Sequence, residues 1–478
     1  MKFQNVSIHK TLLDIRFWIF LLFIIRLIGI TNAPLEIGHN WRQCLTNMIT
    51  RNFFENGANV MYPTIDMAGD QSGIIGSEFP IFNYLIYLVA SVFDYTHWLG
   101  RLINLLVSSF GLYYFYRLIR DLVNREAAYY AAIVLGTSIW FAFSRKVMPD
   151  TFSVSLVIIG LYYCNSYIRS GAKLSIALFF IFSTLGLLSK IPALSIMSII
   201  GVTLFMKEIP LRRKLAVYVS SFVCLLFVGA WYFYWVPHLV ETYKYQLFFT
   251  KGIWEGLMEI IPMSGLVAER FYFSALHSFI GFACFIGGLY YLFKNHDRYV
   301  LTALSLITFT FLIFVLKTGA VFPLHNYYII PFVPLMATIT GYFLYKIPIR
   351  KYAYLILGVI AIEGIGNQQH DFFIKDSERY KLDLESNADK IIGRDELIVI
   401  NGGPSPQQIY FIHRKGWTVS DTELQAEGLL DSLIDRGAKY LIINKTTDGQ
   451  PDFLFPEKYA DRYYSVFALG ALPENEEN

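Results

Sequence analysis

The stretch FWIFLLFIIRLIGITNAPLEIGHNWRQ, residues 17–43, decides the fold class, because an apolar run of bilayer length passes directly into a polar, aromatic segment. A helix needs roughly 20 apolar residues to span the hydrocarbon core of a membrane. HNWRQ (39–43) follows at the exit of that run, where a simple tether would use small polar residues. Trp41 and Arg42 suit a membrane-interface anchor, but they equally suit the wall of a binding site, so both interpretations stand.

The composition of the chain is that of a polytopic membrane protein. Of its 478 residues, 55% are hydrophobic and only 16% are charged, whereas soluble domains carry roughly 25% charged residues. The net charge of +3 gives no indication of nucleic-acid binding. Three of the four cysteines lie within apolar runs, so we expect no disulfide framework. We interpret the first apolar run as a retained anchor, because no convincing small-residue cleavage site follows it.

Apolar runs of span length recur along the chain and predict eleven transmembrane helices. The loops between them alternate between short basic segments and long segments at 34–97, 237–272 and 367–478. The positive-inside rule places the basic segments and the N-terminus in the cytoplasm and the long segments outside. The predicted spans lie near 17–33, 98–116, 127–144, 151–168, 174–189, 191–206, 215–236, 273–293, 298–316, 327–345 and 351–366.

The apolar stretch FPIFNYLIYLVASVF (79–93) is short for a span. If it crossed the membrane, it would reverse the sidedness of every later loop and place the basic segments outside. We therefore expect a helix that lies in the outer interface or re-enters the membrane. The outer loop that contains it, 34–97, is expected to carry much of the site.

The tail differs in composition and predicts a small α/β domain outside the cytoplasm. IVIN (398–401), KYLIIN (439–444) and YYSVFAL (463–469) are typical of strands. An amphipathic helix is expected over 405–416 and a second helix over 422–437, which gives alternating strands and helices. The predicted organisation is a transmembrane region at 1–366 and a soluble extracytoplasmic domain at 367–478.

Acidic and basic side chains gather on the predicted outer face. Ionisable residues at membrane depth are costly, so they usually have a partner or a task. Cations stabilise the charge on a departing phosphate, and a carboxylate can accept the proton of an attacking group. The mixture suits a reaction in which a phosphate leaves and a hydroxyl or amine attacks. It includes His39, Arg42, Asp66, Glu78, Arg145, Lys146, Asp150, Lys190 and His325.

Several of these residues also have purely structural interpretations. Lys190 suits a cation whose head reaches from the membrane edge toward water. Asp150 stands where it would serve as the N-cap of the following helix. Asp66 lies among glycines, in a segment typical of a solvated loop, and His325 suits an interfacial histidine bonded to backbone.

Four stretches, in order and at agreeing loop positions, carry a resemblance to a known family. They are HNWRQ with TRNFFENG after it, SEFPIFNYL (77–85), RKVMPD (145–150) and HNYYIIPFVP (325–334). In these the chain resembles bacterial membrane glycosyltransferases of the C-type fold, the group that includes lipid A aminoarabinose transferases and protein O-mannosyltransferases. Each motif is short, but the likeness extends over about residues 15–345.

The resemblance implies transfer of a sugar from a polyprenyl-phosphate donor to a lipid, glycan or protein acceptor, on the outer face of the bacterial cytoplasmic membrane. The donor's lipid tail would stay among the membrane lipids while its phosphate meets basic residues. Nucleic acid is not an expected partner. No cofactor is certain, although Glu78 with His39 or His325 leaves a divalent metal open.

The chain departs from the family where the family commonly has an Asp-Glu pair just before the arginine. His39 and Asn40 occupy that place. The catalytic base is therefore expected at Glu78 or Asp66, with Asp150 in support, and neutral His39 is the alternative. The side chains expected to bind the donor's phosphate or sugar are Trp41, Arg42, Gln43, Arg145, Lys146, Lys190, His325 and Tyr328.

Two other functions remain open. A polymerase or ligase of surface polysaccharide would also have many spans and a large outer loop. A transporter or flippase for lipid-linked sugars would commonly show inverted repeats and broken helices at mid-membrane. The sequence shows no two-fold internal similarity, and its ionisable residues crowd one face, which disfavours the transporter.

Overall fold

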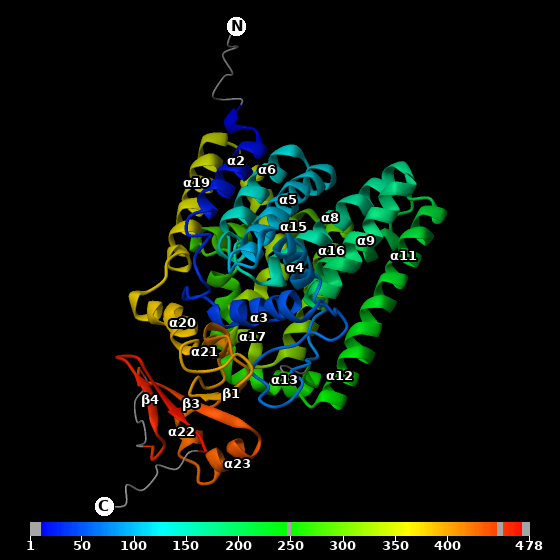
Figure 1. Cartoon of the computed structure of the whole chain (residues 1–478). Helices are drawn as coiled ribbons and strands as arrows, with labels where there is room; N and C mark the ends of the chain where they lie inside the picture. Colours follow the sequence, from blue (N-terminus) through cyan, green and yellow to red (C-terminus); the bar gives the residue numbers. More distant parts are fainter. Residues whose placement is uncertain (1–10, 246–249, 447–452, 471–478) are drawn as a thin grey trace, which may run out of the picture.

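The computed structural model describes residues 11–245, 250–446 and 453–470. Figure 1 shows a helical bundle with a small sheet at one end, and α2 reaches the opposite end. The predicted fold class, a helical membrane protein with a small C-terminal α/β part, is confirmed at this level. The principal helices of the bundle are α2 (Ile15–Arg26), α5 (Leu99–Leu122), α6 (Arg125–Thr137), α8 (Pro149–Ser170), α9 (Lys173–Ser189), α11 (Leu211–Gly229), α15 (Phe279–Asn295), α16 (Arg298–Thr318), α18 (Val333–Lys346) and α19 (Arg350–Gly366).

Within the described ranges, five helical segments are long and apolar enough to cross a membrane, or six if a pair bent by 93° counts as one span. Other predicted spans form shorter helices, such as α2 with 12 residues and α19 with 17. The count of eleven spans and their orientation therefore stay predictions. The stretch at 79–93 forms α4 (Ile81–Phe93), whose 13 residues are too few to cross alone. The five segments are Leu99–Leu122, Pro149–Ser170, Leu211–Tyr243, Arg298–Thr318 and Asn326–Lys346.

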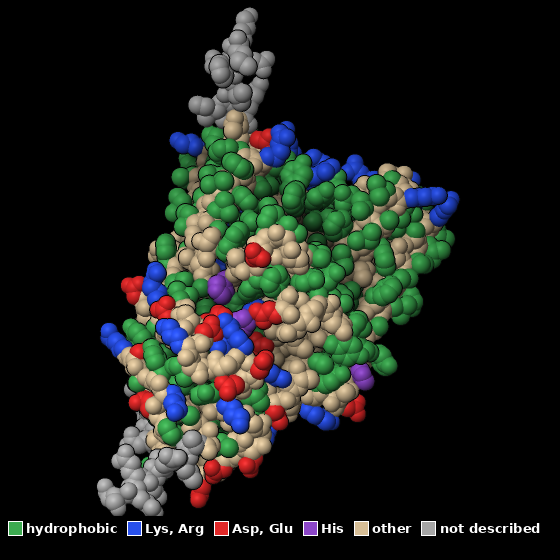
Figure 2. All heavy atoms as spheres, viewed as in Figure 1, with side chains coloured by type: hydrophobic (Ala, Val, Ile, Leu, Met, Phe, Trp, Pro, Cys, Tyr) green, Lys and Arg blue, Asp and Glu red, His purple; other side chains and the backbone are tan. Residues whose placement is uncertain are grey.

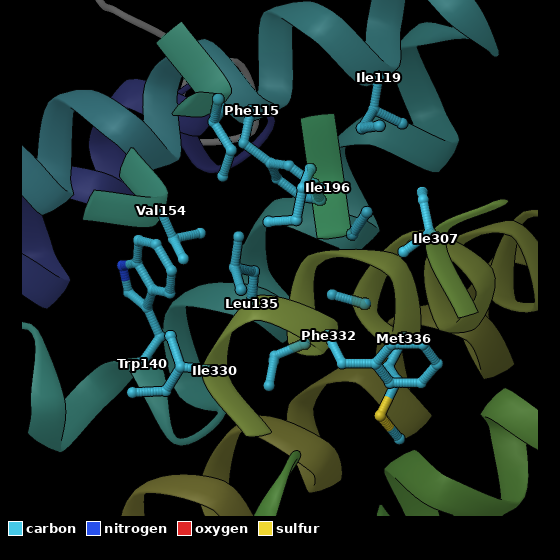
Figure 3. Close-up of a cluster of buried hydrophobic side chains, with 14 of the residues drawn as sticks. Phe115, Ile119, Leu135, Trp140, Val154, Ile196, Ile307, Ile330, Phe332 and Met336 are labelled. Atoms are coloured by element: carbon cyan, nitrogen blue, oxygen red, sulfur yellow. The ribbon is translucent and has the colours of Figure 1, made fainter. Parts of the chain in front are cut away.

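The centre of the bundle is filled by α6 and α18 together with the turn that follows α6. Residues 127–137 of α6 are all buried. A Cβ on Gly341 of α18 would lie 2.5 Å from the backbone nitrogen of Ala131, so glycine allows the two backbones to approach. Figure 3 shows how side chains from distant segments fill this core, among them Leu135, Trp140, Ile330, Phe332 and Met336.

Small residues bring α8 and α9 into close contact. A Cβ on Gly160 of α8 would lie 2.4 Å from the hydroxyl oxygen of Ser183, and one on Gly186 would lie 2.9 Å from a carbonyl oxygen of α8. Helices with small residues at their interface approach closely in membranes. Since α9 ends where α8 begins, this contact brings Lys190 close to Asp150.

The predicted first outer loop, residues 34–97, contains α4 and a second helix, α3 (Asn40–Asn56), which is buried from Arg42 to Phe53. Figure 1 shows the reason, because α3 lies between the helical bundle and the C-terminal part of the chain. Polar groups on α3 are satisfied inside the protein: Asn83 of α4 donates a 2.7 Å hydrogen bond to the carbonyl oxygen of Thr46. HNWRQ therefore begins a covered helix rather than a free tether.

The C-terminal sheet has the strand order β2-β1-β3-β5-β4. The first strand pairs in parallel with β2 and β3, and β5 pairs antiparallel with β3 and β4. The three predicted strands are confirmed as β1, β3 and β5. The other two were not predicted, because β2 has only three residues and β4 is largely exposed. The strands are β1 (Leu397–Ile400), β2 (Gly416–Thr418), β3 (Ala438–Asn444), β4 (Glu457–Ala460) and β5 (Tyr464–Ala468).

Two predicted helices in the tail need correction. The helix expected over 405–416 is the shorter α21 (Gln407–Ile412), and all its residues are buried rather than amphipathic, because it packs between α3 and the sheet. The helix expected over 422–437 is divided into α22 (Asp421–Leu424) and α23 (Leu429–Asp435). Gly428, with a φ of 78°, turns the chain between them. All four cysteines are free, as expected.

Candidate active site

Two cations and two carboxylates alternate in space at the end of the bundle that faces α3. The guanidinium of Arg42 donates a hydrogen bond to Oε1 of Glu78. The ammonium nitrogen of Lys190 lies 3.8 Å from the same oxygen and 3.9 Å from Oδ1 of Asp150. The four side chains are between 5% and 19% exposed. We call Arg42, Glu78, Asp150 and Lys190 the charged cluster.

Asp150 has one oxygen that nothing in the described chain satisfies. It stands in the first turn of α8, after Pro149 at the first helical position, and Met148 is the N-cap. The interpretation of Asp150 as an N-cap is therefore wrong, although an acid in the first turn still favours the helix dipole. Its Oδ2 is buried and has no hydrogen-bond partner among the described residues. An unsatisfied buried acceptor is costly, so this atom is suited to accept a hydrogen from a ligand.

Aromatic and imidazole rings form a wall beside the charged cluster. The ring of His325 lies 5.6 Å from that of Trp41 and 5.5 Å from that of Tyr328. The ammonium of Lys190 lies 5.9 Å from the centre of the Tyr328 ring, a cation–π distance. Burial first, and then the charges of Lys190 and Arg42, lower the pKa of His325, so its ring is neutral at pH 7. The wall therefore offers ring faces and neutral polar atoms to a ligand.

His39, the alternative base, adjoins this wall. Its ring stacks 5.6 Å from that of His325, and its Nε2 lies 2.9 Å from Oδ1 of Asn326. A carbonyl oxygen accepts, so Nε2 carries the proton and donates it. Burial, followed by the charge of Lys146, lowers the pKa of His39 to about 4. The imidazole is therefore neutral at pH 7, but it binds a proton more weakly than an ordinary histidine does.

Arg145 and Lys146 face a different part of the protein. Arg145 donates to three backbone carbonyl oxygens and lies over the ring of Phe372. Lys146 donates to the carbonyl oxygen of Gly38 at 2.6 Å and to Oδ1 of Asp371 at 2.8 Å. Among the ion pairs of the described residues, neither cation reaches Glu78 or Asp150. These two cations hold Asp371, at the start of the C-terminal part of the chain, against residues 26–38.

Asp66 also stands apart from the charged cluster. Its two carboxylate oxygens accept hydrogen bonds from Arg51 at 3.0 Å and from Asn52 at 2.9 Å. Arg51 in turn donates to the carbonyl oxygen of Tyr410 in α21. Asp66 therefore belongs to the contact between α3 and the tail, which makes it a poorer candidate for the base than Glu78 or Asp150.

Gln43 ties the first motif to the third. Its Oε1 accepts a 3.1 Å hydrogen bond from the backbone nitrogen of Val147. Its Nε2 is buried and has no hydrogen-bond partner in the described part of the chain. The side chain therefore fixes the segment that leads into Asp150 and keeps a donor for another group.

Three residues that position the site were not predicted from the sequence. Arg101 forms a buried ion pair with Glu36, which is the nearest acidic residue upstream of HNWRQ. Asp371 forms an ion pair with Lys146, and the side-chain oxygen of Asn326 accepts a hydrogen bond from His39. The only available signal was an arginine at the start of an apolar run and an amide within HNYYIIPFVP.

The metal interpretation gains no support from the geometry. Within the described ranges, no three His, Cys, Asp or Glu side chains are grouped so that they could hold a metal ion. The contacts of Glu78 go to Arg42 and Lys190 rather than to a histidine.

Comparison with known proteins gives one family match. Residues 77–235 match the family model described as dolichyl-phosphate-mannose-protein mannosyltransferase. This third of the chain contains Glu78, Asp150 and Lys190, but not Arg42 or the wall around His325. No curated protein sequence matches the chain.

Solved structures share the fold over nearly the whole chain. The apo structure of ArnT from Cupriavidus metallidurans is 12% identical, with a TM-score of 0.62 over 94% of this chain and 97% of that one. The structure of ArnT bound to undecaprenyl phosphate is 11% identical, with a TM-score of 0.60 over 94% and 98%. Archaeal oligosaccharyltransferase AglB from Archaeoglobus fulgidus, in complex with an inhibitory peptide and a dolichol-phosphate, is 12% identical, with a TM-score of 0.57 over 90% and 69%. The chain thus resembles the membrane glycosyltransferases of the C-type fold, as its four motifs predicted.

Proposed function

We propose that the protein transfers a glycosyl group from a polyprenyl-phosphate-linked sugar to a lipid, glycan or protein acceptor, and that the charged cluster is the site of transfer. The observation that carries the proposal is the unpartnered Oδ2 of Asp150, buried beside the two cations of the cluster. The undecaprenyl phosphate and dolichol-phosphate bound to the proteins of similar fold support a donor of this class.

The electrostatics of the cluster suit a leaving phosphate. Arg42 and Lys190 balance the charges of Glu78 and Asp150. A polyprenyl-phosphate sugar is a phosphodiester with one negative charge, and cleavage of its sugar–oxygen bond leaves a monoester with a second. The two cations are therefore more strongly attracted to the product-like transition state than to the donor, which lowers the barrier.

The carboxylates suit activation of the acceptor. Oδ2 of Asp150 accepts the proton of the acceptor's hydroxyl or amine as that atom bonds to the anomeric carbon. The bond between that carbon and the phosphate oxygen breaks, and its electron pair leaves with the polyprenyl phosphate. Glu78 holds Arg42 and Lys190 in place by accepting from one and attracting the other.

The wall around His325 suits the sugar. Its rings offer apolar faces, and the Tyr328 ring lies 5.9 Å from the ammonium of Lys190 in the charged cluster. The basic inner loops support the orientation that this reaction requires, with the N-terminus inside, the site on the outer face of the bacterial cytoplasmic membrane, and the residues from 367 onward outside.

The test uses purified protein reconstituted in liposomes with a polyprenyl-phosphate sugar and a panel of acceptors. Free polyprenyl phosphate should appear only when the right acceptor is present, and Glu78→Gln should abolish its release. Asp121→Asn is the matched control, because Asp121 pairs with Arg120 near the other end of α5. Movement of the intact donor between leaflets without its cleavage would contradict transfer and favour a flippase. Growth of a glycan chain by repeated addition would identify a polymerase.

A further inference from the structure

The end of the bundle opposite the charged cluster contains a basic cavity. It has a volume of about 270 Å³ and lies between the start of α2 and the turn that joins α5 to α6. We call it the basic cavity, and its lining consists of Leu13, Asp14, Ile15, Arg16, Tyr113, Tyr116, Arg120 and Arg125. None of these residues belongs to the candidate active site.

The basic cavity lies about one membrane thickness from the charged cluster. Asn104, in the second turn of α5, donates to the carbonyl oxygens of Lys146 and Met148, which places this end of the helix beside the site. From Asn104, the 18 residues up to the end of α5 at Leu122 rise roughly 27 Å, close to the thickness of the hydrocarbon core, before the helix ends at the cavity. Figure 2 shows Lys and Arg side chains gathered along that edge of the molecule, at the top of the view.

Acidic side chains occupy only part of the hydrogen-bonding capacity of the arginines in the cavity. Arg16 donates to both oxygens of Asp14, and Arg120 pairs with Asp121. The side chain of Arg125 makes no hydrogen bond or ion pair with the described residues, and its charge acts on Asp14 only at longer range. Guanidinium groups present planar, forked donors that match the oxygens of a phosphate. The lining therefore contains three arginines and one aspartate, and some guanidinium N–H groups stay available to a ligand.

The remaining lining indicates where that phosphate comes from. Tyr113 and Tyr116 suit the headgroup level of a membrane, where tyrosine is enriched. Leu12 and Leu13 are 41% and 36% exposed, so an apolar surface adjoins the cations. A free phosphate ion would gain nothing from contact with that apolar surface, whereas the acyl chain of a phospholipid would pack against it. Basic pockets between membrane helices bind anionic headgroups for this reason.

We propose that the basic cavity binds the phosphate of an anionic phospholipid from the leaflet opposite the candidate active site. Arg120 and Arg125 hold the phosphate, and the tyrosines border the headgroup. The proposal does not rest on the transfer reaction, since the two sites share no residue.

The test measures lipid binding to the purified full-length chain by native mass spectrometry. Phosphatidylglycerol should bind at least about tenfold more tightly than phosphatidylcholine, since each basic residue near the surface adds to anionic lipid binding. Arg120→Gln/Arg125→Gln should remove that preference, and Arg120→Lys/Arg125→Lys should keep most of it. Lys294→Gln/Arg298→Gln, which removes the same charge from the exposed, adjoining ends of α15 and α16, is the matched control and should change little.

Three results would overturn the proposal. Equal binding of the two lipids to the wild-type chain would remove the headgroup specificity. Equal losses in the cavity and control variants would assign the effect to overall surface charge. Binding of inorganic phosphate that is undiminished by phosphatidylglycerol, and lost in the cavity variant, would identify a site for the free ion. Lys190→Gln should leave phosphatidylglycerol binding unchanged, which keeps this result separate from the fate of the proposed transfer.

Discussion

Replacing Lys146 by methionine would break a buried ion pair that we assign to structure rather than to donor binding. Its ammonium lies 2.8 Å from Oδ1 of Asp371, and the two side chains are 3% and 8% exposed. At an effective dielectric constant of about 20, unit charges at that distance attract by roughly 6 kcal/mol. Desolvation cancels part of this, and loss of one partner from a buried pair typically costs about 3–5 kcal/mol. We expect Lys146→Met to lower the free energy of unfolding by that amount.

The pH dependence provides a signature of the same ion pair. Burial opposes ionisation of Asp371, but Lys146 outweighs it, so the pKa of Asp371 lies below its usual 3.8. Without Lys146, burial outweighs the remaining stabilising contacts and raises that pKa. The deficit of Lys146→Met should therefore shrink as the pH falls, because protonation removes the unpaired charge.

Thermal unfolding of the purified protein measures both effects. Asp371→Asn in the Lys146→Met background should recover about 2 kcal/mol or more, because residues in direct contact are coupled. The asparagine keeps an acceptor for the backbone nitrogen of Gly38, which bonds to Asp371 at 3.0 Å. A Lys146→Met protein with an unchanged unfolding midpoint and weakened donor binding would refute this assignment and place Lys146 in the donor site.

Three further changes test the surroundings of the site. Gly38→Ala should lower the free energy of unfolding by about 1–3 kcal/mol, because a Cβ there would lie 2.1 Å from a carboxylate oxygen of Asp371. The control is Gly265→Ala, which should be nearly neutral because a Cβ there would have nothing within 4 Å. Folding lowers the pKa of His39 from 6.5 to about 4, so the folded protein favours the neutral ring. The stability that the neutral ring contributes is therefore complete above pH 6.5 and falls by up to about 3 kcal/mol as the pH is lowered toward 4. His39→Gln should flatten that part of the stability profile, and an unchanged profile would contradict the burial argument. Asp66→Asn should lower the unfolding midpoint yet keep the rate of donor cleavage within about threefold; a hundredfold loss would instead make Asp66 the base.

The part of the site that the sequence could predict is the part set by membrane sidedness. Arg42, Glu78 and Asp150 all follow or precede apolar segments at the same face, so their proximity was expected from the order of the loops. Arg145 and Lys146 are sequence neighbours of Asp150, and sequence proximity suggested a shared role. The turn before α8 directs them elsewhere, toward an acid 225 positions further along the chain. Sequence patterns carry no signal for an ion pair of such separation.

The ends of helices and the short strands could also not be predicted from the sequence. The first predicted span extended to residue 33, but α2 ends at Arg26 because the chain turns at Gly29, with a φ of 63°. Hydropathy does not register such a turn, since Gly29 stands between two isoleucines within the apolar run. In the tail, β2 forms because Gly416 fits tightly against β1, where a Cβ would lie 1.9 Å from the carbonyl oxygen of Ile398. Only the folded arrangement shows that requirement.

The central claim is that the charged cluster carries out glycosyl transfer, with Asp150 accepting the acceptor's proton. The most direct measurement is the single-turnover rate of polyprenyl phosphate release by Asp150→Asn, at saturating donor and with the unfolding midpoint recorded. Asparagine keeps the shape of the side chain but cannot accept the proton, so the rate should fall by about 10²–10⁴-fold while the donor still binds. An Asp150→Asn protein that folds, binds donor and releases polyprenyl phosphate at the wild-type rate would contradict the account.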